Sequence, residues 1–176
     1  IVDWILLGRY TGFCSSEWCQ ETQSKYEQID HWPGQPARAM TRLDFKFLTD
    51  LERRLSDKDL NESIIKYLII KWRIQKNKEN GEEITFGDDT ESIPYSATRA
   101  GYRIYRRSQR LGMKSNEPMA VFRNKQGRVK YITGNMVTTL LRDAASAALG
   151  IDRNHPEILL WSTHSIHVTA ANLLYR

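Results

Sequence analysis

A β-rich segment, a polar turn and a second short strand pattern constrain the fold of this chain more than any other feature. Residues 64–75 are rich in isoleucine, leucine and aromatic residues, residues 76–81 are polar and end in glycine, and residues 84–86 resume the β pattern. β-Branched and aromatic residues favour strands, and a short polar connection between two strands favours antiparallel pairing. We therefore predict a β-hairpin over residues 64–86, with Lys76 at its tip.

The other patterns predict helices around a small antiparallel sheet. We expect helices over residues 1–13, 97–111, 133–149 and 164–175, a strand over residues 43–48 and a second hairpin over residues 118–132. A short second helix should start at residues 15–17, residues 22–37 should form a loop, and residues 51–62 should form a short helix or a loop. Together these elements predict one mostly helical α+β domain, with a three-stranded antiparallel sheet and a hairpin packed beside helices.

Length, cysteine content and charge narrow the class of protein. The 176 residues, 40% of them hydrophobic, suffice for one domain with a real core. The two cysteines, Cys14 and Cys19, make no disulfide framework, so we expect an intracellular protein, and the apolar run at residues 4–7 is far too short to span a bilayer. The 26 Lys and Arg against 21 Asp and Glu permit a nucleic-acid partner without requiring one.

One face of the helix predicted over residues 97–111 is basic. Its cations are Arg99, Arg103, Arg106, Arg107, Arg110 and Lys114. At ~100° per residue they occupy an arc of roughly 100°, and no acid lies between them. Phosphates of a polyanion would relieve the repulsion within this stripe, which favours DNA binding. The alternative is a solvated face whose arginines pair with acids from residues 82–91.

Four separated segments resemble the catalytic domain of tyrosine recombinases, the phage-integrase-like family. Residues 11–17, Thr-Gly-Phe-Cys-Ser-Ser-Glu, resemble the Thr-Gly-x-Arg-x-Ser-Glu motif of the family, and residues 163–174 resemble its His-x-x-Arg helix. Lys76 is similar in place to the family's hairpin lysine, and residues 118–150 match the family's middle region. The order and spacing of the four segments agree over nearly the whole chain.

The resemblance implies DNA recombination and integration chemistry that needs no metal or nucleotide cofactor. In the family a tyrosine attacks a DNA phosphodiester, two arginines clamp the phosphate oxygens, a lysine protonates the leaving 5′-oxygen, and histidines assist. By this resemblance Lys76, His164 and His167 occupy catalytic positions, and the partner is double-stranded DNA.

The resemblance also implies which domains flank this one, where in the cell it acts and what it binds. Residues 1–176 would be one fragmentary catalytic domain, with an N-terminal clamp domain and a C-terminal tyrosine segment outside it. Such a domain would belong to a mobile element, would meet DNA inside the cell (in the nucleus of a eukaryote), and could self-associate on DNA. No membrane partner is expected.

The sequence departs from the family at both arginines. Cys14 stands at the first arginine position and His167 at the second, and Tyr175 lies too close to His164 to be the nucleophile. A thiol supplies no positive charge, and a histidine side chain, with an ordinary pKa of about 6.5, is mostly neutral at pH 7. We therefore expect a DNA-binding domain with a degenerate, inactive site.

Two alternatives to this interpretation stay open. The first is an active recombinase that uses His167 in place of the second arginine. The second is a metal-binding or interaction protein on the same fold, in which Cys14, His164 and His167 bind zinc.

Overall fold

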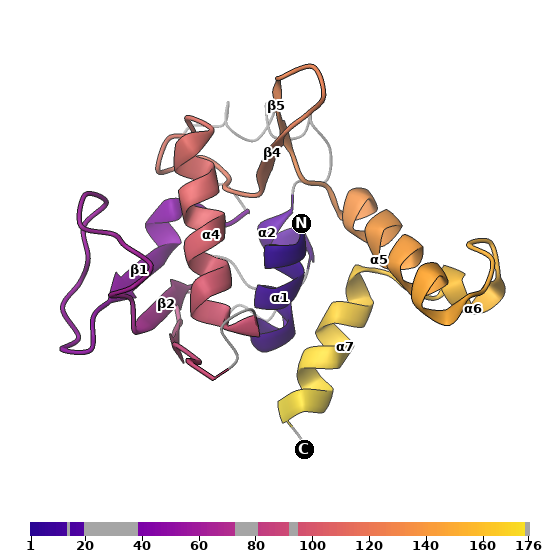
Figure 1. Ribbon diagram of the computed structural model, residues 1–176, viewed down its shortest axis with the longest axis horizontal. Helices are drawn as coiled ribbons and strands as arrows, with labels where there is room; N and C mark the ends of the chain where they lie inside the picture. Colours follow the sequence, from indigo (N-terminus) through magenta and orange to yellow (C-terminus); the bar gives the residue numbers. More distant parts are fainter. Residues whose placement is uncertain (14, 20–38, 73–80, 92–94, 175–176) are drawn as a thin grey trace.

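A three-stranded sheet covered on one side by helices is the centre of the computed structural model, which describes residues 1–13, 15–19, 39–72, 81–91 and 95–174 (Figure 1). The elements are α1 (Val2–Thr11), α2 (Ser15–Trp18), the 3-10 turn η1 (Arg42–Asp44), β1 (Phe45–Leu48), β2 (Tyr67–Lys71), β3 (Glu83–Gly87), α4 (Ala97–Arg110), β4 (Val121–Arg123), β5 (Val129–Tyr131), α5 (Gly134–Leu149), α6 (Pro156–Leu159) and α7 (Thr163–Leu174). The predicted α+β class is confirmed.

Strand β2 lies in the middle of the sheet and pairs antiparallel with both β1 and β3. The predicted first hairpin is confirmed as β2–β3, with Tyr67 opposite Gly87. The predicted tip of this hairpin, including Lys76, lies outside the described residues. Strand β1 starts later than expected because the Asp44 carboxylate accepts hydrogen bonds from the Thr41 N–H (2.7 Å) and hydroxyl (3.0 Å), which closes the 3-10 turn before Phe45.

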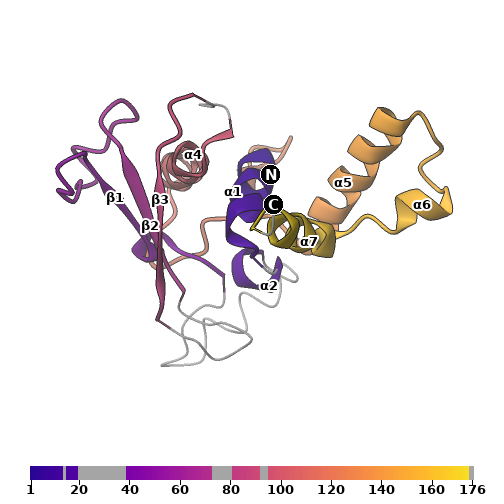
Figure 2. The same ribbon diagram turned by 90° about the horizontal axis from the view of Figure 1, so that it is seen from below.

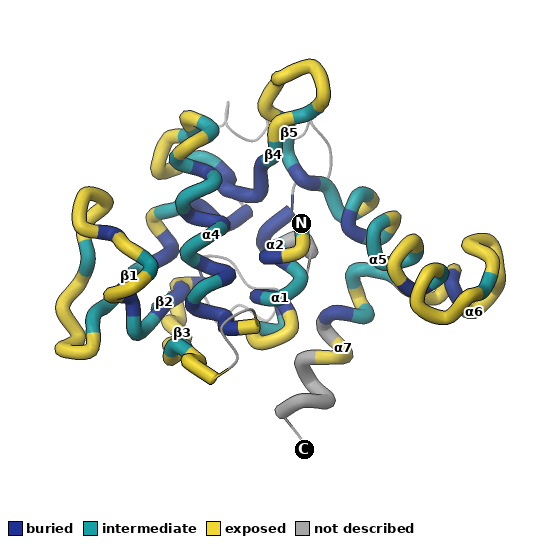
Figure 3. Tube along the Cα trace, viewed as in Figure 1, coloured by how far each residue is buried: buried dark blue, intermediate teal, exposed yellow. Residues whose placement is uncertain are grey.

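The core lies between the sheet and α4, and between α4 and α1. Viewed from below, the sheet, α4, α1 and α7 follow one another as layers (Figure 2). Buried residues gather along α1, β2 and α4, whereas the β4–β5 turn and α6 are largely exposed (Figure 3). Trp4 of α1 stacks on Trp18 of α2 with ring centroids 4.8 Å apart, and both rings are buried.

Gly101 allows α4 to approach β2 closely. A Cβ built at Gly101 would lie 2.3 Å from Cδ2 of Leu68, a fully buried side chain that has no room to move. We expect Gly101→Ala to lower the free energy of unfolding by about 1–3 kcal/mol, although alanine favours helix by about 1 kcal/mol. Urea denaturation measures this loss. The matched control is Gly87→Ala, since a Cβ at Gly87 meets nothing within 4 Å; an equal loss in both variants would contradict the packing argument.

Helices α5 and α6 project from the body, and α7 returns to pack on α1 (Figures 1 and 2). Helix α5 has the predicted ends: the Thr133 hydroxyl accepts a hydrogen bond from the Met136 N–H, and Gly150 ends the helix at φ +68°. The short helix α6 was not predicted, although Pro156 at its first turn is a typical start signal. Residues 51–62 form turns rather than a helix. Among the described residues, no helix combines the length and apolar character needed to cross a membrane.

Candidate nucleic-acid interface

The first arginine of the α4 stripe is engaged inside the protein. Arg99 donates from Nε and Nη2 to the Asp88 carboxylate at 2.9 and 2.7 Å, and from Nη1 to the Glu62 carbonyl at 2.6 Å. The Asp88 side chain is fully buried and that of Arg99 is only 13% exposed. Hydrogen bonding to Arg99 lowers the pKa of Asp88, and the same bonds raise the pKa of Arg99. Arg99 therefore pairs with an acid from residues 82–91, as the alternative interpretation expects.

Two further arginines of the stripe share one carboxylate from α1. Asp3 is 8% exposed and accepts from Arg103 Nε at 2.7 Å and from Arg107 Nη2 at 3.3 Å. These bonds connect α1 to the middle of α4. The charge that compensates Arg103 and Arg107 lies about a hundred residues away in sequence, which explains why α4 itself needs no acid.

The other cations of the stripe have different surroundings. Arg106 donates to the Gln109 side chain at 2.8 Å, and Arg110 is exposed with its Nε 3.4 Å from the Arg106 carbonyl. The structure shows no ion pair to either arginine within the ranges it describes. Lys114 lies beyond α4, because the helix ends at Arg110 and Gly112 turns the chain at φ +79°. Three of the six cations, Arg99, Arg103 and Arg107, thus serve the fold, whereas Arg110 and Lys114 are exposed and Arg106 is partly exposed.

The β4–β5 hairpin carries a second group of cations that we did not predict as a site. Arg123, Lys125, Arg128 and Lys130 fall within eight residues that contain no acid. Residues 118–142 hold five Lys and Arg and no Asp or Glu, so this segment carries five positive charges in addition to the six of residues 99–114. Counting charge by segment would have found it.

A tight turn holds these cations in place. The Asn124 side chain accepts from the Arg128 N–H at 2.9 Å, the Gly127 N–H donates to the Asn124 carbonyl at 2.9 Å, and Gly127 adopts φ +76°. Arg123 Nη1 also donates to the Gly127 carbonyl at 2.8 Å. Lys125 and Arg128 are exposed and are not held by such side-chain bonds in the described structure.

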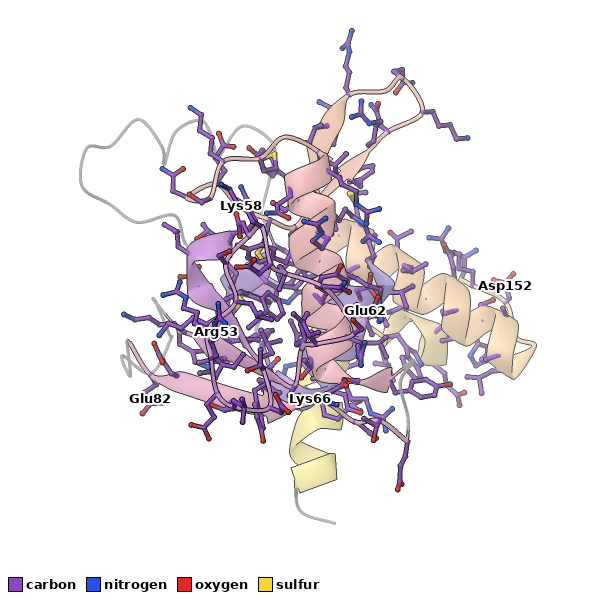
Figure 4. The ribbon with its side chains drawn as sticks, turned by 60° about the vertical axis from the view of Figure 1, so that its left-hand side comes forward. Arg53, Lys58, Glu62, Lys66, Glu82 and Asp152 are labelled. Atoms are coloured by element: carbon purple, nitrogen blue, oxygen red, sulfur yellow. The ribbon has the colours of Figure 1, made fainter. Side chains whose placement is uncertain are left out.

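The hairpin rises beside the C-terminal end of α4 (Figure 1). Its long side chains, tipped with nitrogen, spread away from the body (Figure 4). We define the hairpin surface as Arg106, Arg110, Arg123, Lys125, Arg128 and Lys130. This surface combines two arginines of α4, Arg106 and Arg110, with the four cations of the hairpin.

The residues predicted to be catalytic are described only in part. His164 is exposed near the start of α7, and its backbone N–H donates to the Ser162 hydroxyl at 3.3 Å. His167 lies on α7, but its side chain is outside the described residues, as are Cys14 and Lys76. Helix α7 packs on α1, where a Cβ at Gly8 would lie 2.8 Å from Ile166 Cγ2. The structure therefore places the histidine helix against the helix that precedes the Thr11–Glu17 motif.

The zinc hypothesis stays a prediction. Within the described residues, no group of three or more His, Cys, Asp or Glu side chains is arranged to hold a metal ion. Two of the three proposed ligands, Cys14 and the His167 side chain, fall outside that part of the chain.

Comparison of the chain with models of protein families, with curated proteins and with solved structures finds no match. The resemblance to tyrosine recombinases therefore rests on the sequence motifs, and the hairpin surface is the structural feature that bears on function.

Proposed function

We propose that this chain is a double-stranded DNA-binding domain of tyrosine-recombinase type whose catalytic site is degenerate. The observation that carries the proposal is the exposed β4–β5 hairpin, which lies in a segment, residues 118–142, that holds five cations and no acid. Lys and Arg side chains that neutralise DNA phosphates release condensed counterions, and this release dominates binding that is independent of base sequence.

The shape of the hairpin surface supports duplex DNA as the partner. A two-stranded ribbon fits the major groove of B-DNA, which is about 12 Å wide, and cations on both strands can then reach phosphates on the groove walls. Helix α4 contacts β4, so Arg106 and Arg110 near its C-terminal end would extend the contact along the DNA backbone.

The degenerate site follows from the replacements at the two arginine positions. Removing one preorganised oxyanion donor costs about 10²–10³ in rate, and Cys14 and His167 stand where two guanidinium groups would clamp the phosphate. The domain would thus keep the DNA partner, and its location with DNA in the cell, without the strand transfer. If His167 does replace the second arginine, the full-length protein will form a covalent adduct with a nicked suicide duplex.

The test is the salt dependence of binding to a fluorescently labelled duplex, followed by anisotropy. Six neutralised phosphates predict a slope of log K against log salt of about −5. A chain that shows no binding at low salt, or a slope near zero, would refute the proposal. Stoichiometric zinc in the purified protein, found by elemental analysis together with absent DNA binding, would instead favour the metal-binding alternative.

A further inference from the structure

A cavity of about 420 Å³ opens between η1, β1, the segment joining β1 to β2, and the C-terminal part of α4. Its volume lies within the range of small-molecule sites, about 300–1,000 Å³. Apolar side chains from Phe45, Phe47, Leu55 and Leu60 line it. None of the cations of the hairpin surface lines the cavity, so it is a separate feature of the molecule.

The charges that line the cavity do not balance. Lys46 is among the lining residues, but its Nζ lies 2.5 Å from Glu83 Oε1 on β3, the other edge strand of the sheet, so its charge is already paired. The remaining charged residues of the described lining are two cations, Arg42 and Arg54, and one carboxylate, Asp57. The described lining is therefore apolar with one more cation than carboxylates.

Arg42 is the most buried of these cations and is incompletely bonded. Its side chain is only 10% exposed, Nη2 donates to the Met113 carbonyl at 2.7 Å, and Nη1 lies 3.5 Å from Asp57 Oδ2. Among the described residues, the buried Nε–H has no acceptor. A guanidinium carries five N–H donors, and those of a buried arginine are normally satisfied. The guanidinium carbon also lies 5.5 Å from the centre of the Tyr105 ring, over its face.

The one carboxylate of the cavity is shared. Tyr105 donates its hydroxyl proton to Asp57 Oδ1 at 2.5 Å, and the Asp57 side chain is 55% exposed. Burial, together with this hydrogen bond, raises the pKa of Tyr105 to about 12, so the hydroxyl stays protonated and keeps donating at neutral pH. Asp57 therefore compensates the charge of Arg42 only weakly, because their contact is long and open to solvent.

We propose that this cavity binds a small amphiphilic carboxylate. The carboxylate would meet the Arg42 guanidinium near Nη1, with Arg54 as the second cation, and a short apolar or aryl group would lie on Phe45, Phe47 and Leu60. A carboxylate suits this site because its planar pair of oxygens matches a guanidinium edge. The apolar lining argues against a bare inorganic anion or a DNA phosphate, and the proposal does not depend on DNA binding.

The test follows the Arg42 Nε–H signal in nitrogen–proton correlation spectra during titration with phenylbutyrate. The signal is identified by its loss in Arg42→Lys. Phenylbutanol has the same apolar group without the charge, and acetate has the charge without the apolar group. We expect a saturable shift with phenylbutyrate, with a dissociation constant of about 1 mM, and binding at least about tenfold weaker for either control.

Two variants keep the proposal open to refutation. Arg42→Lys retains the charge but loses the guanidinium, and we expect phenylbutyrate binding, followed in this variant by the backbone amide signals of the lining residues Phe45 and Leu60, to weaken by about tenfold or more. Because Arg42 also holds the Met113 carbonyl, the variant Arg54→Gln, which leaves Arg42 intact, provides a second test and should weaken binding severalfold. Absence of any shift with phenylbutyrate, or equal binding of phenylbutanol, would overturn the proposal.

Discussion

Reversing two charges on the β4–β5 hairpin, with Lys125→Glu and Arg128→Glu, should weaken duplex binding by about a hundredfold at low salt. Each substitution removes a phosphate contact and places a carboxylate where a phosphate would lie. Both side chains are exposed, and the bonds that Arg128 makes in the turn use its backbone, so the hairpin should stay folded. Anisotropy at several salt concentrations should also show a slope less steep by about 2.

The matched control reverses two cations elsewhere. Arg53 and Lys58 lie in the segment between β1 and β2, away from the hairpin, and both are exposed (Figure 4). Arg53→Glu with Lys58→Glu changes the net charge by the same amount and should weaken binding far less. Equal losses in the two double variants would mean that binding follows net charge alone, and an unaffected hairpin variant would place the DNA on another face.

The contribution of α4 needs a variant that spares the fold. Reversal of Arg103 would break its bond to Asp3 as well as any contact with DNA, so a loss of binding could not be assigned. Arg106→Glu with Arg110→Glu is the cleaner choice, because neither arginine pairs with a carboxylate in the described structure.

Replacing Asp88 with asparagine should lower the free energy of unfolding at neutral pH by about 3 kcal/mol, because Arg99 would lose its buried partner and keep only the partly exposed Glu62 carboxylate, 3.8 Å from its Nη1. The Asp88 carboxylate accepts from Arg99 at two nitrogens and from the hydroxyl of Ser96, the residue that caps α4. The substitution therefore weakens both the arginine and the start of the helix. Urea denaturation at neutral pH measures the loss.

Acid should remove the same contribution from the unchanged protein. The pKa of Asp88 is lowered in the folded state, chiefly by the hydrogen bonds from Arg99. The stabilisation is therefore fully present above the pKa of the unfolded chain, about 3.9 for aspartate, and is lost as pH falls through the lower folded value. The gap in stability between the protein and Asp88→Asn should shrink below about pH 4.

Glu82→Gln is the control for Asp88→Asn. Glu82 is an exposed acid in the same segment (Figure 4), and its change from carboxylate to amide should leave stability within about 0.5 kcal/mol. If Asp88→Asn behaves like Glu82→Gln at every pH, the buried pair does not stabilise the fold as described.

The sequence by itself determined most of the elements, because their signals are local. Residues that favour strands, separated by a polar turn, predicted the first hairpin, and alternation of apolar residues predicted β1. Thr133 and Gly150 marked the ends of α5 through hydrogen bonding and left-handed backbone within one turn. The two differences between the predicted and the observed elements also have local causes. The Thr41–Asp44 turn shortened β1, and the four residues of α6 were too few to produce a periodic pattern.

Only the tertiary structure decided which cations remain available to a partner. On the sequence, six cations of the α4 stripe were equivalent, because no acid lay between them. Folding brings Asp88 to Arg99, and it brings Asp3 from the other end of the chain to Arg103 and Arg107. Charges interact through space rather than along the chain, so only the folded structure shows that Arg106 and Arg110, unlike the other three arginines of the stripe, have no carboxylate partner among the described residues.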